Sequence, residues 1–358
     1  MSETILPLTK KCIQIKSTPD NAAALSEILE LALSELSDFT IERFEKKGVQ
    51  SALVYNTAKR PKKFKVLFNV HLDIIPAKEE QYIPRIVGDK LYGAGAMDMK
   101  ANAVCAIRAF QDVAKEVSYP VALQLVTDEE VGGFNGAGYQ VEKGVRTDFV
   151  IAVEPTNFDI VHKTKGVLLL KIIARGKTAH GAYPWRGDNA IEKINSFLNA
   201  LTKKYPIPQR EKWATTINIS TIETSNRAFN KIPDECSVSL DIRYVPADGK
   251  SLVKNIRGLL PKGCNIEIFA NEPAIDTRPD NSYVKTLRRA SKKILGKESV
   301  IRGAHGSSDA RHFARVGGVG VEIGPIGGGI GSDKEWVSIR SLEKFRRILR
   351  EFLLALSA

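Results

Sequence analysis

Short apolar runs alternate with a helix-like segment in the first part of the chain. The runs FKVLFNV (64–70), VALQLVT (121–127) and FVIAV (149–153) have the length and the nearly continuous apolar character of strands buried on both faces. Between the first two runs, residues 100–117 place apolar side chains at helical spacing. This strand–helix–strand alternation predicts an α/β domain with a mostly parallel sheet.

The pattern changes near residue 166. Strand-like segments then dominate, and they are interrupted by two helix-like segments. The strand-like segments are 167–177, 214–223, 235–245 and 265–270, and the helix-like segments are 189–204 and 251–260. Runs of strands with two helices indicate a small α+β domain whose sheet has one covered face.

After residue 273 the α/β pattern returns, with a helix at 282–295, a strand at 319–323 and a closing helix at 340–356. We therefore predict a discontinuous α/β domain, residues 1–165 and 274–358, interrupted by a smaller inserted domain at 166–273. A chain of 358 residues is long enough for two such cores.

Charge and composition narrow the class of protein. The net charge is +12. The basic stretches at 287–293 and 344–350 carry apolar residues at helical spacing, so their charges are typical of the solvent-exposed faces of amphipathic helices. No segment approaches the 18 apolar residues of a membrane span, and the four cysteines lie far apart. These features predict a cytoplasmic protein with no nucleic-acid partner and no membrane partner.

Acidic and imidazole side chains follow the predicted strands of the α/β domain. His71 and Asp73 end the first strand, Asp128, Glu129 and Glu130 follow the second, and Glu154 follows the third. Each feature also has an interpretation without a function. His71 could be a hydrogen-bonded histidine of the core, residues 128–130 an exposed acidic turn, and Glu154 an exposed glutamate. Asp98, which follows a glycine-rich turn and precedes a helix, has the plain interpretation of a helix cap.

Their common location favours a metal site. Ligands of open α/β sheets bind beyond the carboxyl ends of the strands, where these side chains are expected to lie. Imidazole together with carboxylates suits Zn²⁺, with Mn²⁺ and Co²⁺ as relatives. A carboxylate left over beside the metal could accept a proton from water.

The motifs that carry these residues resemble the M20 family of metallopeptidases and deacylases, which includes acetylornithine deacetylase, succinyl-diaminopimelate desuccinylase and carboxypeptidase G2. They are HLDxxP (71–76), LYGxGAxDMK (91–100), DEE (128–130), EPT (154–156), GKTAHGAYPWRGDNAI (176–191), NKIPDECSVSLDIR (230–243) and GSSDARHF (306–313). The resemblance spans nearly the whole chain in the family's order. It implies a zinc-peptidase-like catalytic domain with an inserted lid or dimerisation domain, and a homodimer.

The resemblance also implies a role for each matching residue. The first metal would be bound by His71, Asp98 and Glu154, and the second by Asp98 and Glu130. Glu129 would be the general base, Asp73 would orient His71, and His180 would stabilise the oxyanion, in dimeric relatives at a neighbouring subunit's active site. Arg243 would bind the substrate carboxylate, since a guanidinium binds carboxylate through two hydrogen bonds. Asn230 and Ser307 would line the substrate pocket.

The chain departs from the family pattern at its C-terminal glycine-rich turn, which has five glycines within residues 324–331. Taken alone, such a turn could hold phosphate or form a tight connection. In the family it delivers a histidine, the last ligand of the second metal, and here that position is Gly331. The possible substitutes are Ser332, Asp333, His305 and His312. Two smaller departures are Ala94 in place of the usual arginine and Ala101 in place of the usual glycine.

Two functions follow from these observations. The first is a hydrolase that cleaves the amide bond of a small N-acyl amino acid or peptide with metal-activated water, with Glu129 as general base and one or two metal ions per chain. The second is a catalytically impaired relative that binds an amino-acid-like ligand, which the glycine at position 331 favours. The retained Glu129, His180 and Arg243 favour the hydrolase, because a binding protein has no chemical need for a general base.

Overall fold

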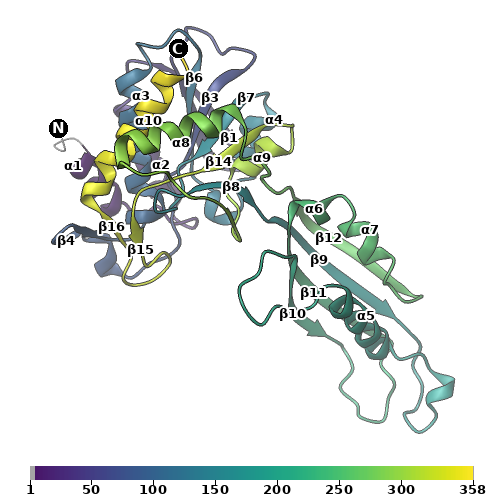
Figure 1. Cartoon of the computed structure of the whole chain (residues 1–358). Helices are drawn as coiled ribbons and strands as arrows, with labels where there is room; N and C mark the ends of the chain where they lie inside the picture. The colour runs from purple at the N-terminus through teal and green to yellow at the C-terminus, as the bar shows by residue number, and fades with distance from the viewer. Residues whose placement is uncertain (1–4, 358) are drawn as a thin grey trace. The chain divides into compact units, whose positions relative to one another are not determined.

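The computed structural model describes residues 5–357 and divides into two compact units (Figure 1). The first unit comprises Met1–Lys163, Ile275–Gly303 and Ser308–Ala358, and the second comprises Thr164–Ala274 and Ala304–Ser307. Each unit has its own hydrophobic core.

The first unit contains both strands and helices. They are α1 (Ile5–Gln14), α2 (Ala22–Ser34), β1 (Thr40–Lys46), β2 (Val49–Tyr55), β3 (Phe64–His71), η1 (Glu79–Tyr82), β4 (Arg85–Val87), β5 (Lys90–Tyr92), η2 (Ala96–Lys100), α3 (Ala101–Val113), β6 (Val121–Val126), η3 (Glu129–Val131), α4 (Ala137–Glu142), β7 (Thr147–Ala152), β8 (Ile160–Thr164), α8 (Ser282–Leu295), β13 (Ile301–Ala304), α9 (Ala310–Ala314), β14 (Val319–Glu322), β15 (Gly327–Gly328), β16 (Trp336–Ser338) and α10 (Ile339–Ala355).

An eight-stranded sheet forms the centre of this unit, in the order β1-β2-β6-β3-β7-β14-β8-β13. Its inner pairs β6–β3, β3–β7 and β7–β14 are parallel, and β1–β2, β2–β6 and β14–β8 are antiparallel. The predicted α/β class with a mainly parallel sheet is confirmed. The helix expected at 100–117 is shorter than predicted, since α3 ends at Val113.

Helices cover both faces of the sheet because its inner strands are apolar on both sides. On β3, Val66, Phe68 and Val70 pack into one core with α3 and α10, while Leu67 packs into a second core on the opposite face with Phe313 of α9. This alternation follows from the two-residue period of a strand.

The register of the inner strands aligns their carboxyl ends. His71, the last residue of β3, pairs with Val126 at the end of β6, and Ala152 at the end of β7 pairs with Glu322 at the end of β14. The polar residues that follow these strands therefore come together at one edge of the sheet.

A small four-stranded sheet of the same unit has the order β15-β16-β5-β4. It pairs the strands beside the C-terminal glycine-rich turn with β5 and β4 from the first part of the chain. In this sheet Trp336 pairs with Tyr92, although the two are far apart in the sequence.

The second unit is an α+β structure around an antiparallel sheet in the order β10-β11-β9-β12. Its elements are β9 (Gly166–Arg175), η4 (Pro184–Arg186), α5 (Ala190–Lys204), β10 (Thr216–Glu223), β11 (Glu235–Tyr244), α6 (Pro246–Gly249), α7 (Leu252–Arg257) and β12 (Cys264–Glu272). Helices α5 and α7 pack on the sheet through Phe197, Leu201 and Ile256. Within residues 5–357, no helix is both long and apolar enough to cross a membrane.

Candidate metal centre

Three side chains meet at the carboxyl edge of the central sheet. His71 Nε2 lies 3.1 Å from Asp98 Oδ1 and 4.0 Å from Glu154 Oε2. The three residues each offer one ligand atom, and these atoms lie within 4.8 Å of one another. His71 comes from the end of β3, Asp98 from the irregular turn η2, and Glu154 from the segment after β7.

The chemistry of this group fits a divalent cation. Glu154 Oε1 is buried without a hydrogen-bond partner. Burial raises the pKa of Glu154 well above its usual value, and the negative charges of Asp98 and Glu129 add to this, although His71 opposes it. Burial lowers the pKa of His71, but the hydrogen bond to Asp98 and the charge of Glu154 outweigh it, so this pKa is raised. A cation would relieve the crowding of negative charge, and nitrogen and carboxylate oxygen are ligands of Zn²⁺.

Asp73 lies directly behind His71. Its backbone carbonyl is 3.0 Å from His71 Nδ1, whereas its carboxylate Oδ1 is 3.7 Å from the same nitrogen. Asp73 Oδ2 accepts a hydrogen bond of 2.9 Å from the backbone N–H of Glu130. Asp73 therefore connects the imidazole to the acidic turn, and its carbonyl is the atom closer to the ring.

The acidic turn places Glu129 and Glu130 in η3, directly after β6. Burial and the negative charge of Asp309 together raise the pKa of Glu129 to about 8, although the charges of His71 and Arg311 oppose this. Burial also raises the pKa of Glu130, to about 7. The third acid, Asp128, has a structural role, because its carboxylate accepts hydrogen bonds from the backbone N–H groups of Asn135 and Gly136.

The segment 308–312 contacts the end of this acidic turn. Arg311 Nη2 donates a hydrogen bond of 2.6 Å to the carbonyl of Gly132, and His312 Nε2 lies 3.2 Å from the same oxygen. The carboxylate of Asp309 packs against Gly133, where a Cβ atom would lie 1.8 Å from Oδ1. The sequence motif GSSDARHF contains these residues, but its spacing alone does not show that they contact the acidic turn.

Two other acidic residues of the first unit were not predicted. Glu335 accepts hydrogen bonds from the turn that carries Asp98. Glu322 is buried at the end of β14, its pKa is raised to about 7 by burial, and its charge raises the pKa of Glu154. For Glu322 the sequence signal was present, because an acid follows an apolar strand there as at Glu154.

The glycine-rich turn lines a cavity of about 440 Å³ together with Asp98 and Glu130. Gly331 is part of this lining and has a positive φ of 68°. Of the possible substitute ligands, Asp333 is ion-paired with Lys78. The hydroxyl of Ser332 donates a hydrogen bond of 2.7 Å to the carbonyl of Gly329 in its own turn.

The two histidines considered as substitutes make other contacts. His312 contacts Asp309, Gly132 and the ring of Phe134. His305 belongs to the second unit, where its Nε2 lies 3.2 Å from Glu211 Oε1. Neither is a member of the group formed by His71, Asp98 and Glu154.

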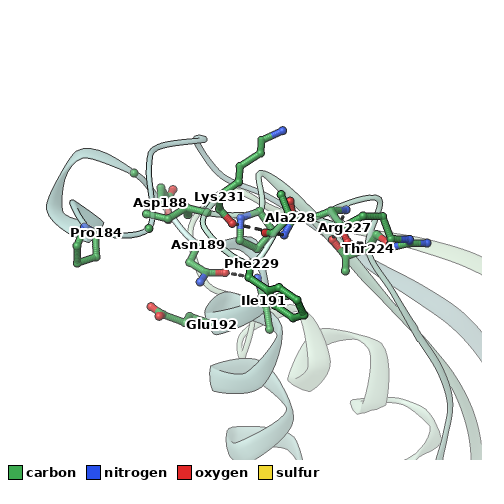
Figure 2. Close-up of a pocket in the computed structure, with 15 residues that line it drawn as sticks. Pro184, Asp188, Asn189, Ile191, Glu192, Thr224, Arg227, Ala228, Phe229 and Lys231 are labelled. Carbon is green, nitrogen blue, oxygen red and sulfur yellow. Dashed lines mark hydrogen bonds between the residues drawn. The ribbon is translucent and has the colours of Figure 1, made fainter.

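The remaining predicted residues belong to the second unit. His180 and Asn230 lie on adjacent loops, joined by a hydrogen bond of 2.7 Å from the Gly181 N–H to the Asn230 carbonyl. These loops and the start of α5 surround an open cavity of about 790 Å³, which Figure 2 shows with Phe229 among its lining residues. The guanidinium of Arg243 donates two hydrogen bonds, of 2.8 and 3.2 Å, to the carboxylate of Asp241. The hydroxyl of Ser307 is buried without a hydrogen-bond partner.

Comparison with known proteins identifies the class. The model of peptidase family M20/M25/M40 matches residues 67–355, so the chain belongs to this family. It is therefore a hydrolytic enzyme, a metal-dependent amide hydrolase, and the group at His71 is in keeping with that class.

Among curated proteins, the chain is 28% identical to a succinyl-diaminopimelate desuccinylase of Delftia acidovorans, with 99% of this chain and 98% of that protein aligned. It is 27% identical to the enzyme of the same name from an Azoarcus species, over 95% and 94% of the two chains.

Solved structures share the fold at lower identity. Aminopeptidase PepT of Bacillus cereus has a TM-score of 0.80 at 18% identity and covers 100% of this chain and 99% of its own. A metallo-carboxypeptidase of Sulfolobus solfataricus has a TM-score of 0.75 at 19% identity, with 98% of both chains covered. A Bacillus subtilis protein described as a dinuclear metal-binding peptidase of the M20 family has a TM-score of 0.71 at 13% identity, over 99% of this chain and 98% of its own.

Proposed function

We propose that this protein hydrolyses the amide bond of a small N-acyl amino acid or peptide, with His71, Asp98 and Glu154 as ligands of a zinc ion. The observation that carries the proposal is the convergence of these three side chains at the carboxyl edge of the sheet, with two carboxylates crowded around one imidazole. The sequence similarity to desuccinylases supports an N-acyl substrate. Co²⁺ and Mn²⁺ have compatible ligand preferences.

In this proposal the metal, when bound, supplies the Lewis acidity that activates water and polarises the amide carbonyl. Glu129 accepts the proton of the attacking water at its carboxylate and passes it to the leaving amine. Asp73 fixes the ring of His71 and the backbone of Glu130 at once. His180 stabilises the developing oxyanion, Arg243 binds the substrate carboxylate, and Asn230 and Ser307 line the pocket.

The second metal position is the part of the site that this chain changes. Asp98 and Glu130 line one cavity with Gly331, which has no side chain to offer a ligand atom. We propose that the first position binds metal tightly and that the second binds it weakly. An impaired relative that only binds an amino-acid-like ligand is the second candidate function, and Gly331 is the observation that favours it.

We also propose a homodimer formed through the second unit. Strands β10 and β12 are the edges of its sheet, and an exposed edge is a template for pairing with another chain. Trp185 and Phe229, on the loops that carry His180 and Asn230, are 74% and fully exposed. Sedimentation that shows only monomer at micromolar concentration would contradict the dimer. A cytoplasmic location is in keeping with four cysteines that are all free thiols.

The test combines metal content with turnover. The purified protein is analysed for bound metal and assayed on N-succinyl and N-acetyl amino acids and on dipeptides. The hydrolase proposal predicts turnover of at least one substrate class, loss of turnover in Glu129→Gln, and unchanged metal content in that variant, because Gln removes the proton acceptor and not a ligand. Ligand binding without turnover on the whole panel would favour the impaired relative instead. Comparable activity in Glu129→Gln would show that the base is misassigned.

A further inference from the structure

Glu335 connects the C-terminal glycine-rich turn to the loop that carries Asp98. Glu335 Oε1 accepts hydrogen bonds from the backbone N–H groups of Met97 (2.7 Å) and Asp98 (3.0 Å). Its other oxygen, Oε2, accepts a hydrogen bond of 3.2 Å from the N–H of Gly95. One carboxylate therefore accepts hydrogen bonds from three backbone amides of the turn that ends in Asp98.

This contact is built by the small sheet. The pairing of β16 with β5 places Trp336 opposite Tyr92, so Glu335 lies opposite Gly93, whose N–H donates a hydrogen bond of 3.3 Å to the Glu335 carbonyl. Both the backbone and the side chain of Glu335 are thus bound to the 93–98 turn. The residue is only 6% exposed, so solvent does not replace these hydrogen bonds easily.

The turn depends on this partner because it is irregular. Asp98 and Met99 have non-helical backbone angles inside η2, and the preceding Gly95 has a positive φ of 70°. Amides in such a turn have no regular ladder of acceptors, and a buried N–H without an acceptor is costly. The carboxylate of Glu335 supplies acceptors for three of them.

We propose that Glu335 is a positioning residue for the metal centre, which holds the backbone of Asp98 so that its carboxylate faces His71 and Glu154. The inference rests on the proposed metal role of Asp98. The C-terminal turn, which offers no ligand side chain at Gly331, then acts on the metal centre through its backbone-binding glutamate. Residues that orient metal ligands typically contribute 10- to 100-fold in metal affinity.

Only a carboxylate of this length satisfies the three amides. Gln has a single acceptor oxygen, and its NH₂ group would face an N–H donor of the turn. Asp retains two acceptor oxygens but is one methylene shorter. We therefore expect Glu335→Gln to disturb the turn strongly and Glu335→Asp to have an intermediate effect.

The experiment is a calorimetric titration of the metal-free full-length protein with Zn²⁺, repeated for Glu335→Gln, Glu335→Asp, Asp98→Asn and Glu343→Gln. The last is the control, a partly exposed glutamate of α10 whose partner is Arg346. Substitution with Co²⁺ provides a second readout, because its visible absorption reports the ligand geometry. Circular dichroism checks that each variant is folded.

We expect Glu335→Gln to weaken Zn²⁺ binding by about 10- to 100-fold and to alter the Co²⁺ spectrum. Glu335→Asp should show a smaller loss of Zn²⁺ affinity and a smaller change in the Co²⁺ spectrum. Glu343→Gln should match the unmodified protein in both measurements. If Asp98→Asn weakens Zn²⁺ binding but Glu335→Gln does not, the positioning role is wrong while the proposed function stands. If Asp98→Asn binds Zn²⁺ like the unmodified protein, the ligand assignment in the proposed function fails, and the role of Glu335 fails with it.

Discussion

Arg311 contacts Glu129 of the acidic turn, with Arg311 Nη1 3.7 Å from Glu129 Oε1. The other terminal nitrogen of the same guanidinium donates to the Gly132 carbonyl at 2.6 Å. Arg311 therefore contacts both a side chain and the backbone of one turn. Because the arginine side chain is only 7% exposed, this pair is little screened by solvent.

The first prediction concerns this pair. Arg311→Gln should lower kcat by about 10²-fold, because the carboxylate of Glu129 loses the group that fixes its orientation, and small misplacements of a catalytic group have effects of this size. Arg311→Lys should recover only part, since a lysine cannot bind two groups in the planar geometry of a guanidinium. KM and metal content should change little. Arg278→Gln, which removes an exposed ion pair with Asp280, is the control, and a kcat in Arg311→Gln equal to that of the control would refute the role.

The second prediction concerns the close approach of Asp309 to Gly133. Gly133→Ala would place a Cβ 1.8 Å from Asp309 Oδ1, at a φ of 63°. Gly144→Ala is the matched control, because Gly144 also has a positive φ, 88°, but has open space around the added Cβ. The left-handed conformation alone costs about 1–2 kcal/mol for a residue with a Cβ.

We therefore expect both alanine variants to melt at a lower temperature and Gly133→Ala to melt well below Gly144→Ala. Thermal unfolding followed by circular dichroism measures the difference. Gly133→Ala should also lose turnover, since its clash lies in the turn that carries Glu129. Equal melting temperatures for the two variants would show that Asp309 moves away freely.

The third prediction concerns Arg243, whose guanidinium is already occupied by Asp241 in the structure. Hydrogen bonds between charged groups contribute about 1.5–3 kcal/mol, so Arg243→Ala should raise KM by roughly 10- to 100-fold for substrates with a free carboxylate. Amidated analogues should be affected much less. Asp241→Asn should weaken the internal competitor and lower KM for the same substrates. If Arg243→Ala raises KM equally for both substrate types, Arg243 does not bind the carboxylate.

The parts of the fold that were predictable are those with strong local periodicity. The apolar run at 64–70 forms β3, and the helix predicted at 282–295 forms α8 with those bounds, because burial on one or both faces leaves a period in the sequence. The small sheet was not predictable. Its strands have two or three residues, too few to show a period, and β16 pairs with β5 across most of the chain.

Some residues of the candidate site were likewise predictable from the sequence, and others were not. The acids that follow apolar strands were found because the strand end places them at the edge of the sheet. Arg311 and Glu335 bind backbone groups of other segments, and Asp309 packs closely against Gly133. No local pattern marks a side chain that contacts a distant part of the chain in this way. Their roles become visible only when tertiary packing brings 309–311 to the acidic turn and 335 to the turn at 95–98.

The last prediction concerns Gly331. A histidine here would start from a backbone with φ 68°, and its Cβ would meet only Ile75 Cδ1, at 3.4 Å. The side chain would have access to the cavity of about 440 Å³ that Asp98 and Glu130 also line. Gly331→Ala is the matched control, because it carries the same strain of about 1–2 kcal/mol without adding a ligand atom.

If the missing imidazole is what weakens the second position, Gly331→His should bind more metal than Gly331→Ala, approaching two ions per chain, and should turn over substrate faster. Metal content after dialysis and calorimetric titration with Zn²⁺ measure the first effect. Adding Glu130→Gln to Gly331→His should remove the gain, since it removes the other ligand proposed for that position. Two tightly bound ions in the unmodified protein, with no gain from Gly331→His, would show that a different residue completes the site. Asp333 would then be tested first, because releasing its carboxylate from Lys78 would free an acceptable zinc ligand on the wall of the same cavity.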